Sequence, residues 1–157
     1  MIKYLIENGG ADIIINNSIG SSPLNILCKI KSNSDSIHSI DYLINEGTDV
    51  NDKDENGISP LLTACYFNNK KVLEHLIENH TADININIRN NYGDSALITL
   101  GYFNNEDFIK YFIEHHKANI YLRNKNGDTL LNVVKSIKNR NIEEYLKNKN
   151  IGNYYIL

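Results

Sequence analysis

The sequence of this 157-residue chain predicts an all-helical repeat protein, in which similar pairs of helices follow one another and stack. Two observations support this fold class. Four glycines recur at nearly equal intervals, and each stands two residues before a Ser or Thr that opens an apolar run: Gly20, Gly57, Gly93 and Gly127. A second series, of apolar pairs, follows the same interval at Leu5-Ile6, Leu43-Ile44, Leu76-Ile77 and Phe112-Ile113.

The interval between these landmarks defines the length of the repeat. The glycines are 37, 36 and 34 residues apart, and comparison with the apolar pairs locates insertions of four, three and one residues. Without the insertions every spacing becomes 33 residues. A fixed period of this length is typical of one helix-turn-helix unit repeated along the chain. Stacked units form extended surfaces rather than enclosed catalytic pockets.

Each repeat is expected to begin with a short helix. A residue type that caps helix N-termini precedes every apolar run, at Ser22, Ser59, Ser95 and Thr129. Pro23 and Pro60 then occupy the first helical position, where the missing N–H of proline is tolerated. We expect this first helix to extend for about nine residues from each cap.

A second, amphipathic helix is expected in every repeat, over residues 37–46, 70–79, 106–116 and 141–149. A truncated copy, Met1–Asn8, opens the chain. The turns at Asn56-Gly57 and Asn126-Gly127 suit the hairpin-like loops that join the repeats. The stretch Lys31–Ser39 holds four extra residues, which we expect to lengthen the surface loop between two helices.

These repeats resemble the ankyrin repeat, a 33-residue unit with a β-turn and two helices. The Thr-Pro-Leu-His start of that unit is matched by Ser22-Pro23-Leu24-Asn25, Ser59-Pro60-Leu61-Leu62, Ser95-Ala96-Leu97-Ile98 and Thr129-Leu130-Leu131-Asn132. Its closing Gly-Ala-Asp-Val-Asn pattern is matched by Gly47-Thr48-Asp49-Val50-Asn51. The resemblance implies an all-α, ankyrin-type repeat solenoid whose helix-turn-helix repeats are joined by β-hairpin-like loops.

The resemblance also implies one domain over residues 1–157, with a partial repeat at 1–16. Four repeats follow, at about 17–53, 54–89, 90–123 and 124–157, and the last is a truncated cap. Two features depart from the family. The His near the start of the first helix is replaced everywhere, which puts the hydrogen-bond bridge between repeats in question. The Gly that ends the second helix is His80 and His116 in two repeats.

Composition and motifs argue against several functions. The net charge of -3 gives no clustered basic face for nucleic acid, and no apolar run approaches the length of a membrane span. Two cysteines and no secretory leader indicate a reducing, intracellular setting, which we take as the cytoplasm with the nucleus left open. No catalytic motif or cofactor motif is found, so we predict that the chain is not an enzyme.

Residues that could carry chemistry are interpreted as structural. Cys28 and Cys65 share one repeat position that favours a small buried residue, about 10 Å apart and too far for a disulfide. His80, His115 and His116 lack a third repeat-matched ligand, so no metal site is predicted from them.

The predicted function is protein–protein interaction as a scaffold, adaptor or inhibitor, with binding on the hairpin tips and on the concave face of the first helices. Tyr66 recurs as Tyr102 at the end of a first helix, and tyrosine is a favoured binding anchor. We expect the neighbouring Phe67 and Phe103 to pack under the turn instead. The predicted partner-binding residues are Glu55, Asn56, Ile58, Tyr66, Asn91, Tyr92, Asp94, Tyr102, Lys125, Asn126 and Asp128.

Two further expectations concern the context of the chain. The alternative function is a fragment or targeting module of a larger multidomain protein that carries the catalytic activity elsewhere. The chain opens inside a second helix, so Ile2, Leu5 and Ile6 lack a preceding repeat to cover them. We therefore expect an exposed apolar patch and weak self-association at this face. The partner is otherwise expected to be another protein, with neither nucleic acid nor membrane involved.

Overall fold

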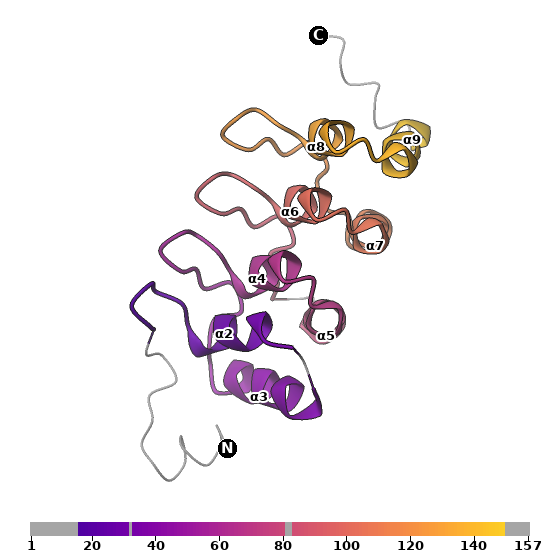
Figure 1. Ribbon diagram of the computed structural model, residues 1–157. Coiled ribbons are helices and arrows are strands. Elements are labelled where there is room, and N and C mark those ends of the chain that lie inside the picture. The colour runs from indigo at the N-terminus through magenta and orange to yellow at the C-terminus, as the bar shows by residue number, and fades with distance from the viewer. Residues whose placement is uncertain (1–15, 32, 81–82, 150–157) are drawn as a thin grey trace. The chain divides into compact units, whose positions relative to one another are not determined.

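The computed structural model describes residues 16–31, 33–80 and 83–149, and these residues form eight helices and no β-strand (Figure 1). The chain divides into two compact units, residues 1–91 and residues 92–157, which we call the N-terminal unit and the C-terminal unit. Each unit contains two helix pairs, and every pair is preceded by a loop that projects away from the first helix. The all-helical repeat prediction is confirmed.

The helices alternate between short first helices and longer second helices. In the N-terminal unit they are α2 (Pro23–Lys29), α3 (Ser34–Asn45), α4 (Pro60–Tyr66) and α5 (Lys70–Asn79). In the C-terminal unit they are α6 (Ala96–Tyr102), α7 (Glu106–His116), α8 (Leu130–Ser136) and α9 (Arg140–Asn148). The first helices have seven residues each, which is shorter than the expected length.

The predicted caps explain where the first helices begin. The side chains of Ser22, Ser59, Ser95 and Thr129 each accept a hydrogen bond from the backbone N–H three residues later. A capping oxygen satisfies one of the four N–H groups that have no partner inside the helix. The sequence therefore sets these four starting points locally.

Asparagine explains the tight turns between α4 and α5 and between α6 and α7, whereas Lys138, with a φ of 59°, takes the left-handed conformation between α8 and α9. After the last residue of α4 and its cap, Asn68 has a φ of 49°, in the left-handed region that Asn tolerates better than most residues. Asn69 then stands at the N-cap position of α5, although its side chain makes no capping hydrogen bond there. The same sequence serves the C-terminal unit, where Asn104 has a φ of 54° and Asn105 caps α7.

The inserted residues of the first complete repeat lie in a helix and not in a loop. Helix α3 begins at Ser34, three residues earlier than expected, because Asn33 and Ser36 form a reciprocal capping box. Ser36 is buried. The expectation of a longer surface loop across Lys31–Ser39 was wrong, since most of the insertion adds a turn to the helix.

Apolar side chains on facing helices form the core of each unit. Helix α2 packs on α4 in the N-terminal unit and α6 packs on α8 in the C-terminal unit, and each first helix also packs on its own second helix. Cys28 and Cys65 are both fully buried, as predicted. Burial raises the pKa of both thiols, because a thiolate loses its hydration in the apolar interior.

Candidate partner-binding surface

The hairpin tips are closed by an Asn or Asp three residues before the repeat glycine. In the N-terminal unit, Asp54 Oδ1 accepts hydrogen bonds from the N–H groups of Asn56 and Ile58, at 2.9 and 2.8 Å. In the C-terminal unit, Asn124 Oδ1 accepts from Asn126 and Asp128, at 3.0 and 2.9 Å. A side chain that bonds its own loop in this way fixes the turn without help from neighbouring helices.

Successive tips are joined by backbone hydrogen bonds inside each unit. In the N-terminal unit the N–H of Glu55 donates to the carbonyl of Ile19 at 3.3 Å, and that of Asn91 donates to Asn56 at 2.9 Å. The N–H of Lys125 donates to the carbonyl of Tyr92 at 2.8 Å in the C-terminal unit. These links hold neighbouring tips at a fixed separation, so their outer side chains form a pre-arranged surface.

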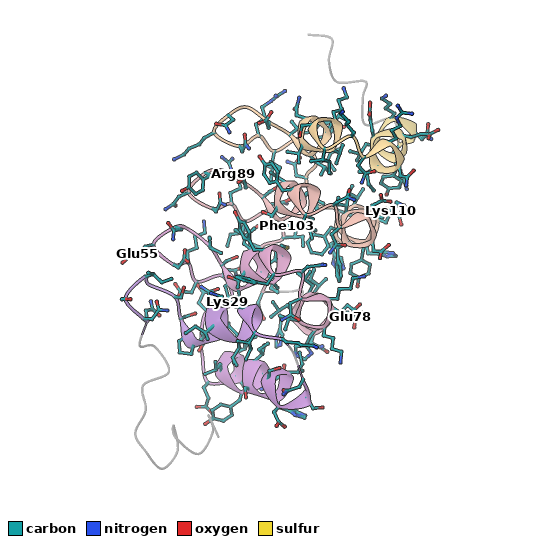
Figure 2. All side chains as sticks on the ribbon, viewed as in Figure 1. Lys29, Glu55, Glu78, Arg89, Phe103 and Lys110 are labelled. Carbon is teal, nitrogen blue, oxygen red and sulfur yellow. The ribbon has the colours of Figure 1, made fainter. Side chains whose placement is uncertain are left out.

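Most of the predicted binding residues lie on this surface. Those that are exposed are Glu55, Asn56, Asn91, Tyr92, Tyr102, Lys125 and Asn126, and those that are partly exposed are Ile58, Tyr66 and Asp128. Glu55 lies at the outer end of its loop (Figure 2). A binding role for these residues remains a prediction.

Asp94 differs from the other predicted residues because it is buried, with 8% of its surface exposed. Its Oδ1 accepts a hydrogen bond from Asn124 Nδ2 at 2.9 Å. Asp94 therefore connects the start of one repeat to the tip of the next, and it does not belong to the contact surface. The sequence could not reveal this, since the two residues are 30 positions apart.

The two repeated tyrosines support the tips through their hydroxyl groups. Tyr66 accepts a hydrogen bond from Asn90 at 3.1 Å, and Tyr102 accepts one from Asn124 at 3.3 Å. Burial raises the pKa of Tyr102, and the negative charges of Asp94 and Asp128 raise it further. Since the ring of Tyr102 stays half-exposed, the residue combines support of a tip with exposed apolar area.

The expectation that Phe67 and Phe103 pack under the turn was wrong. They are 52% and 49% exposed, and each is the cap residue at the end of a first helix. Apolar side chains are exposed at the same repeat position in the other two copies, as Ile30 and Ile137. Lys29 Nζ lies 5.1 Å from the centre of the Phe67 ring, within the range of a cation–π contact.

The sequence contained a signal for these residues, because all four stand ten residues after the repeat glycine. Apolar side chains were assigned to the core by type, so the repeated exposure at this position was missed. We call Ile30 and Phe67, with Phe103 and Ile137, the apolar cap residues of the two units.

Between the first two complete repeats, Asn25 forms the hydrogen-bond bridge that the loss of the family's His put in question. Its Nδ2 donates to the carbonyl of Ile58 at 3.2 Å, and its Oδ1 accepts from the hydroxyl of Thr63 at 3.3 Å. Asn25 is buried, so both contacts are shielded from water. The equivalent Asn132 instead forms a capping box with Thr129 at the start of α8.

The histidines at the ends of second helices have separate surroundings. His80 follows α5 with a φ of -125°, so it does not adopt the left-handed cap of a glycine. His116 is the last residue of α7, and Lys117 takes the left-handed conformation with a φ of 50°. Neither residue preserves the glycine cap at its own position.

Among the residues that the structure describes, one group of potential metal ligands converges: Asp41, His75 and His80. Asp41 and His75 lie on the second helices α3 and α5, and His80 follows α5. Sequence reasoning missed this group because it compared His80 only with cysteines and other histidines. Burial works to raise the pKa of Asp41, but hydrogen bonds and charge from the two histidines outweigh it and lower this pKa.

Comparison with known proteins identifies the family. A family model for ankyrin repeats in three copies matches residues 1–88, and the chain therefore belongs to the ankyrin repeat family. The fold class is an ankyrin-type repeat solenoid, as predicted. No curated protein matches the chain. Ankyrin repeats are in general protein-interaction modules without catalytic activity.

The part of the chain that the structure describes has no helix with the length and apolar character needed to cross a membrane. Ile2, Leu5 and Ile6, on which the expected self-association depends, lie outside the described residues.

Proposed function

We propose that this chain is a non-catalytic binding module of the cytoplasm, which holds another protein as a scaffold, adaptor or inhibitor. The contact surface in each unit consists of the hairpin tips and the apolar cap residues. Four repeats in one domain, preceded by a partial copy, would supply this surface. A partner protein fits better than nucleic acid or a membrane, because the chain has a net charge of -3.

The observation that carries the proposal is the repeated exposure of apolar side chains at one position. The exposed residues at this position belong to types that proteins usually bury, and they are Ile30, Phe67, Phe103 and Ile137. Single exposed apolar residues are ordinary on protein surfaces, but a series that recurs at one repeat position favours a contact role. Aromatic members of such a series are typical binding anchors.

The hairpin tips support the proposal through their rigidity. Their backbone groups are already paired within each unit, so a partner does not have to order them. Pre-arranged loops reduce the entropy lost on binding, which raises affinity for a given contact area. The exposed Tyr92 adds a large side chain with a polar end to the tip of its own unit.

The experiment identifies a partner and then measures where it binds. The full chain, cross-linked in a cell extract, supplies the partner, and its dissociation constant is measured with purified components. The double variants Ile30→Ser/Phe67→Ser and Phe103→Ser/Ile137→Ser test the apolar cap residues. At least one should weaken binding about 30-fold, as expected for a hot spot of about 2 kcal/mol.

The matched control is the double variant Lys71→Ser/Glu78→Ser, which changes two exposed positions of α5. It should bind the partner as tightly as the wild type does. The unfolding free energies of all three double variants should lie within about 1 kcal/mol of the wild-type value. The proposal is contradicted if the control loses the partner while both cap variants keep it.

Tyr66 and Tyr102 need a separate pair of substitutions, because their hydroxyl groups support the tips. Changing either to Phe should reduce stability by about 0.5–1 kcal/mol and leave binding unchanged. Changing either to Ala should weaken binding by about 2 kcal/mol. A stability loss of about 3–5 kcal/mol in both Ala variants would place the rings in the core and leave the tips as the binding surface.

A further inference from the structure

Three side chains from two successive repeats converge in the N-terminal unit. Asp41 lies on α3, His75 lies on α5 four residues before its end, and His80 follows that helix. The Nε2 atoms of both histidines point to the same carboxylate oxygen, Asp41 Oδ1, at 2.6 Å from His75 and 3.1 Å from His80. The three potential ligand atoms all lie within 4.8 Å of one another.

The end of α5 explains how two histidines five residues apart share one face. Each residue of an α-helix turns the side chain by about 100°, so position i+5 would lie about 140° away from position i. His80 avoids this because α5 ends at Asn79 and the His80 backbone, with a φ of -125°, leaves the helical path. The two rings consequently meet edge to face, with centroids 5.7 Å apart.

The repeat fold does not require these residues. The position of His75 holds tyrosine in the other repeats, as Tyr42, Tyr111 and Tyr145. In the C-terminal unit, Lys110 and Tyr145 occupy the positions of Asp41 and His75, and Lys110 Nζ lies 5.8 Å from the ring centre of Tyr145. A carboxylate between two imidazoles is therefore a property of this one pair of repeats.

We propose that Asp41, His75 and His80 bind a divalent transition-metal ion of the zinc class, through one carboxylate oxygen and the two Nε2 atoms. Imidazole together with carboxylate suits Zn²⁺, Co²⁺ or Ni²⁺, whereas Mg²⁺ and Ca²⁺ prefer oxygen ligands alone. Three protein ligands leave a fourth tetrahedral position for water.

The two spacings that involve Asp41 are close to those of a tetrahedral site, and the third, between the ligand atoms of the two histidines, is at most 4.8 Å. Ligands bound to zinc at about 2.0–2.2 Å are about 3.3 Å apart. The carboxylate oxygen of Asp41 would have to move away from His75 by about 0.7 Å and from His80 by about 0.2 Å to reach that spacing. The Asp41 side chain is 35% exposed, so a shift of this size meets little resistance, and both histidines are held in largely buried surroundings.

Asn79 supplies an outer partner for one of the ligands. Its side-chain nitrogen lies 3.1 Å from His75 Nδ1. A metal on Nε2 leaves the proton of the ring on Nδ1, which then needs an acceptor. A half-turn of the Asn79 amide would place its oxygen there and orient the His75 ring, in exchange for the hydrogen bond that the nitrogen now donates to the His75 carbonyl at 3.1 Å.

Metal binding would link the second helices of two successive repeats, since Asp41 belongs to α3 and His75 to α5. An ion that binds only the folded unit stabilises it in proportion to the logarithm of its concentration. The site uses none of the tip or apolar cap residues. Failure of the metal site and failure of the proposed partner surface are therefore separate results.

The experiment uses the full chain without an affinity tag, stripped of metal with a chelator. Zn²⁺ is titrated by calorimetry, and Co²⁺ by its visible absorption, which reports tetrahedral coordination. The wild type should bind one ion per chain and unfold at a higher temperature when Zn²⁺ is present. Asp41→Asn and His75→Tyr should each weaken Zn²⁺ binding at least tenfold and remove the thermal shift.

The chain provides its own matched substitution. His75→Tyr places at this position the residue that the other repeats have, and Tyr145 shows that such a tyrosine can donate to a carboxylate on the neighbouring helix, Glu114, at 2.9 Å. His75→Gln serves if the tyrosine variant does not fold. The control His115→Gln/His116→Gln should bind Zn²⁺ within twofold of the wild type.

Three results would overturn the proposal. One is a wild type that binds no Zn²⁺, and another is a His75→Tyr variant, shown folded by circular dichroism, that binds as tightly as the wild type. The third is loss of binding in the His115→Gln/His116→Gln control with binding retained in Asp41→Asn.

Discussion

The two units place the same repeat position in different surroundings. Gly57 in the N-terminal unit and Gly127 in the C-terminal unit have similar left-handed backbones, with φ of 74° and 83°. A Cβ on Gly57 would lie 2.8 Å from the backbone nitrogen of Asn91, whereas a Cβ on Gly127 would meet nothing within 4 Å. The repeat therefore sets the backbone conformation, and the neighbouring tip decides whether a side chain has room.

The second helices differ between the units in the same way. Asp41 and His75 form a hydrogen-bonded pair in the N-terminal unit. In the C-terminal unit the equivalent Lys110 and Tyr145 form a cation–π contact, and Tyr145 donates to Glu114. One helix arrangement thus carries either a potential metal site or a tyrosine–carboxylate contact, depending on three or four side chains.

The largest expected effect is the protection of the two cysteines, which both belong to the N-terminal unit. Cys28 and Cys65 are fully buried, and their raised pKa leaves little thiolate to react. An opening free energy of about 3 kcal/mol would slow modification by about 100-fold. Reaction with a thiol reagent at pH 8, with and without denaturant, measures this protection. Rapid native modification of either cysteine would contradict it.

The glycine pair tests the first comparison directly. Gly57→Ala combines left-handed strain with a clash against the next tip, so we expect a loss of about 3–4 kcal/mol in unfolding free energy. Gly127→Ala adds strain alone and should cost about 1–2 kcal/mol. Denaturant unfolding of both variants gives the two values, and equal losses would show that the contact with Asn91 is unimportant.

Thiol modification of the same glycine variants tests the predicted single domain. If the two units open separately, Gly57→Ala speeds modification of Cys28 and Cys65, and Gly127→Ala does not. If residues 1–157 unfold as one cooperative domain, both variants speed it in proportion to their loss of stability.

Features that depend on a few consecutive residues were predictable from the sequence. The helix starts at Ser59 and Ser95 and the hairpin glycines follow from local hydrogen bonding and backbone preference, so the fold class and the repeat length could be derived. The start of α3 was missed although the capping box of Asn33 and Ser36 is equally local. That error came from treating inserted residues as a loop.

Features that depend on neighbouring repeats were not predictable in the same way. The burial of Asp94 depends on Asn124, and the exposure of Phe67 depends on what the adjacent repeat leaves uncovered. The meeting of Asp41 with His75 joins residues 34 positions apart. A single sequence shows that such residues share a repeat position, but the contacts come from packing between copies.

The Asn pair tests whether an equivalent position can have two roles. Asn25→Ala removes a buried bridge and leaves the carbonyl of Ile58 and the hydroxyl of Thr63 without this partner, so we expect a loss of about 2 kcal/mol. Asn132→Ala removes one exposed half of a capping box and should cost about 0.5 kcal/mol. Unfolding free energies from denaturant titration give both values. Similar losses would contradict the assignment of different roles.

The smallest expected effect concerns Tyr145, the counterpart of His75. Burial, together with the hydrogen bond to Glu114 and the negative charge of that carboxylate, raises its pKa from 10.0 to about 12. The folded protein therefore holds this proton more tightly than the unfolded chain. The stability that the protonated phenol contributes is complete below pH 10 and is lost as the pH rises toward about 12.

Since the contact is largely exposed, Tyr145→Phe should cost less than about 0.5 kcal/mol of unfolding free energy at pH 8. At pH 11 the unfolded wild-type chain ionises this tyrosine and the Phe variant has nothing to ionise, so the small advantage of the wild type should vanish or reverse. Denaturant unfolding at both pH values measures the difference in unfolding free energy between the wild type and the Phe variant. The remaining tyrosines ionise in both proteins, so their effect cancels in this difference. A wild-type advantage that grows between pH 8 and pH 11 would contradict the role assigned to this contact.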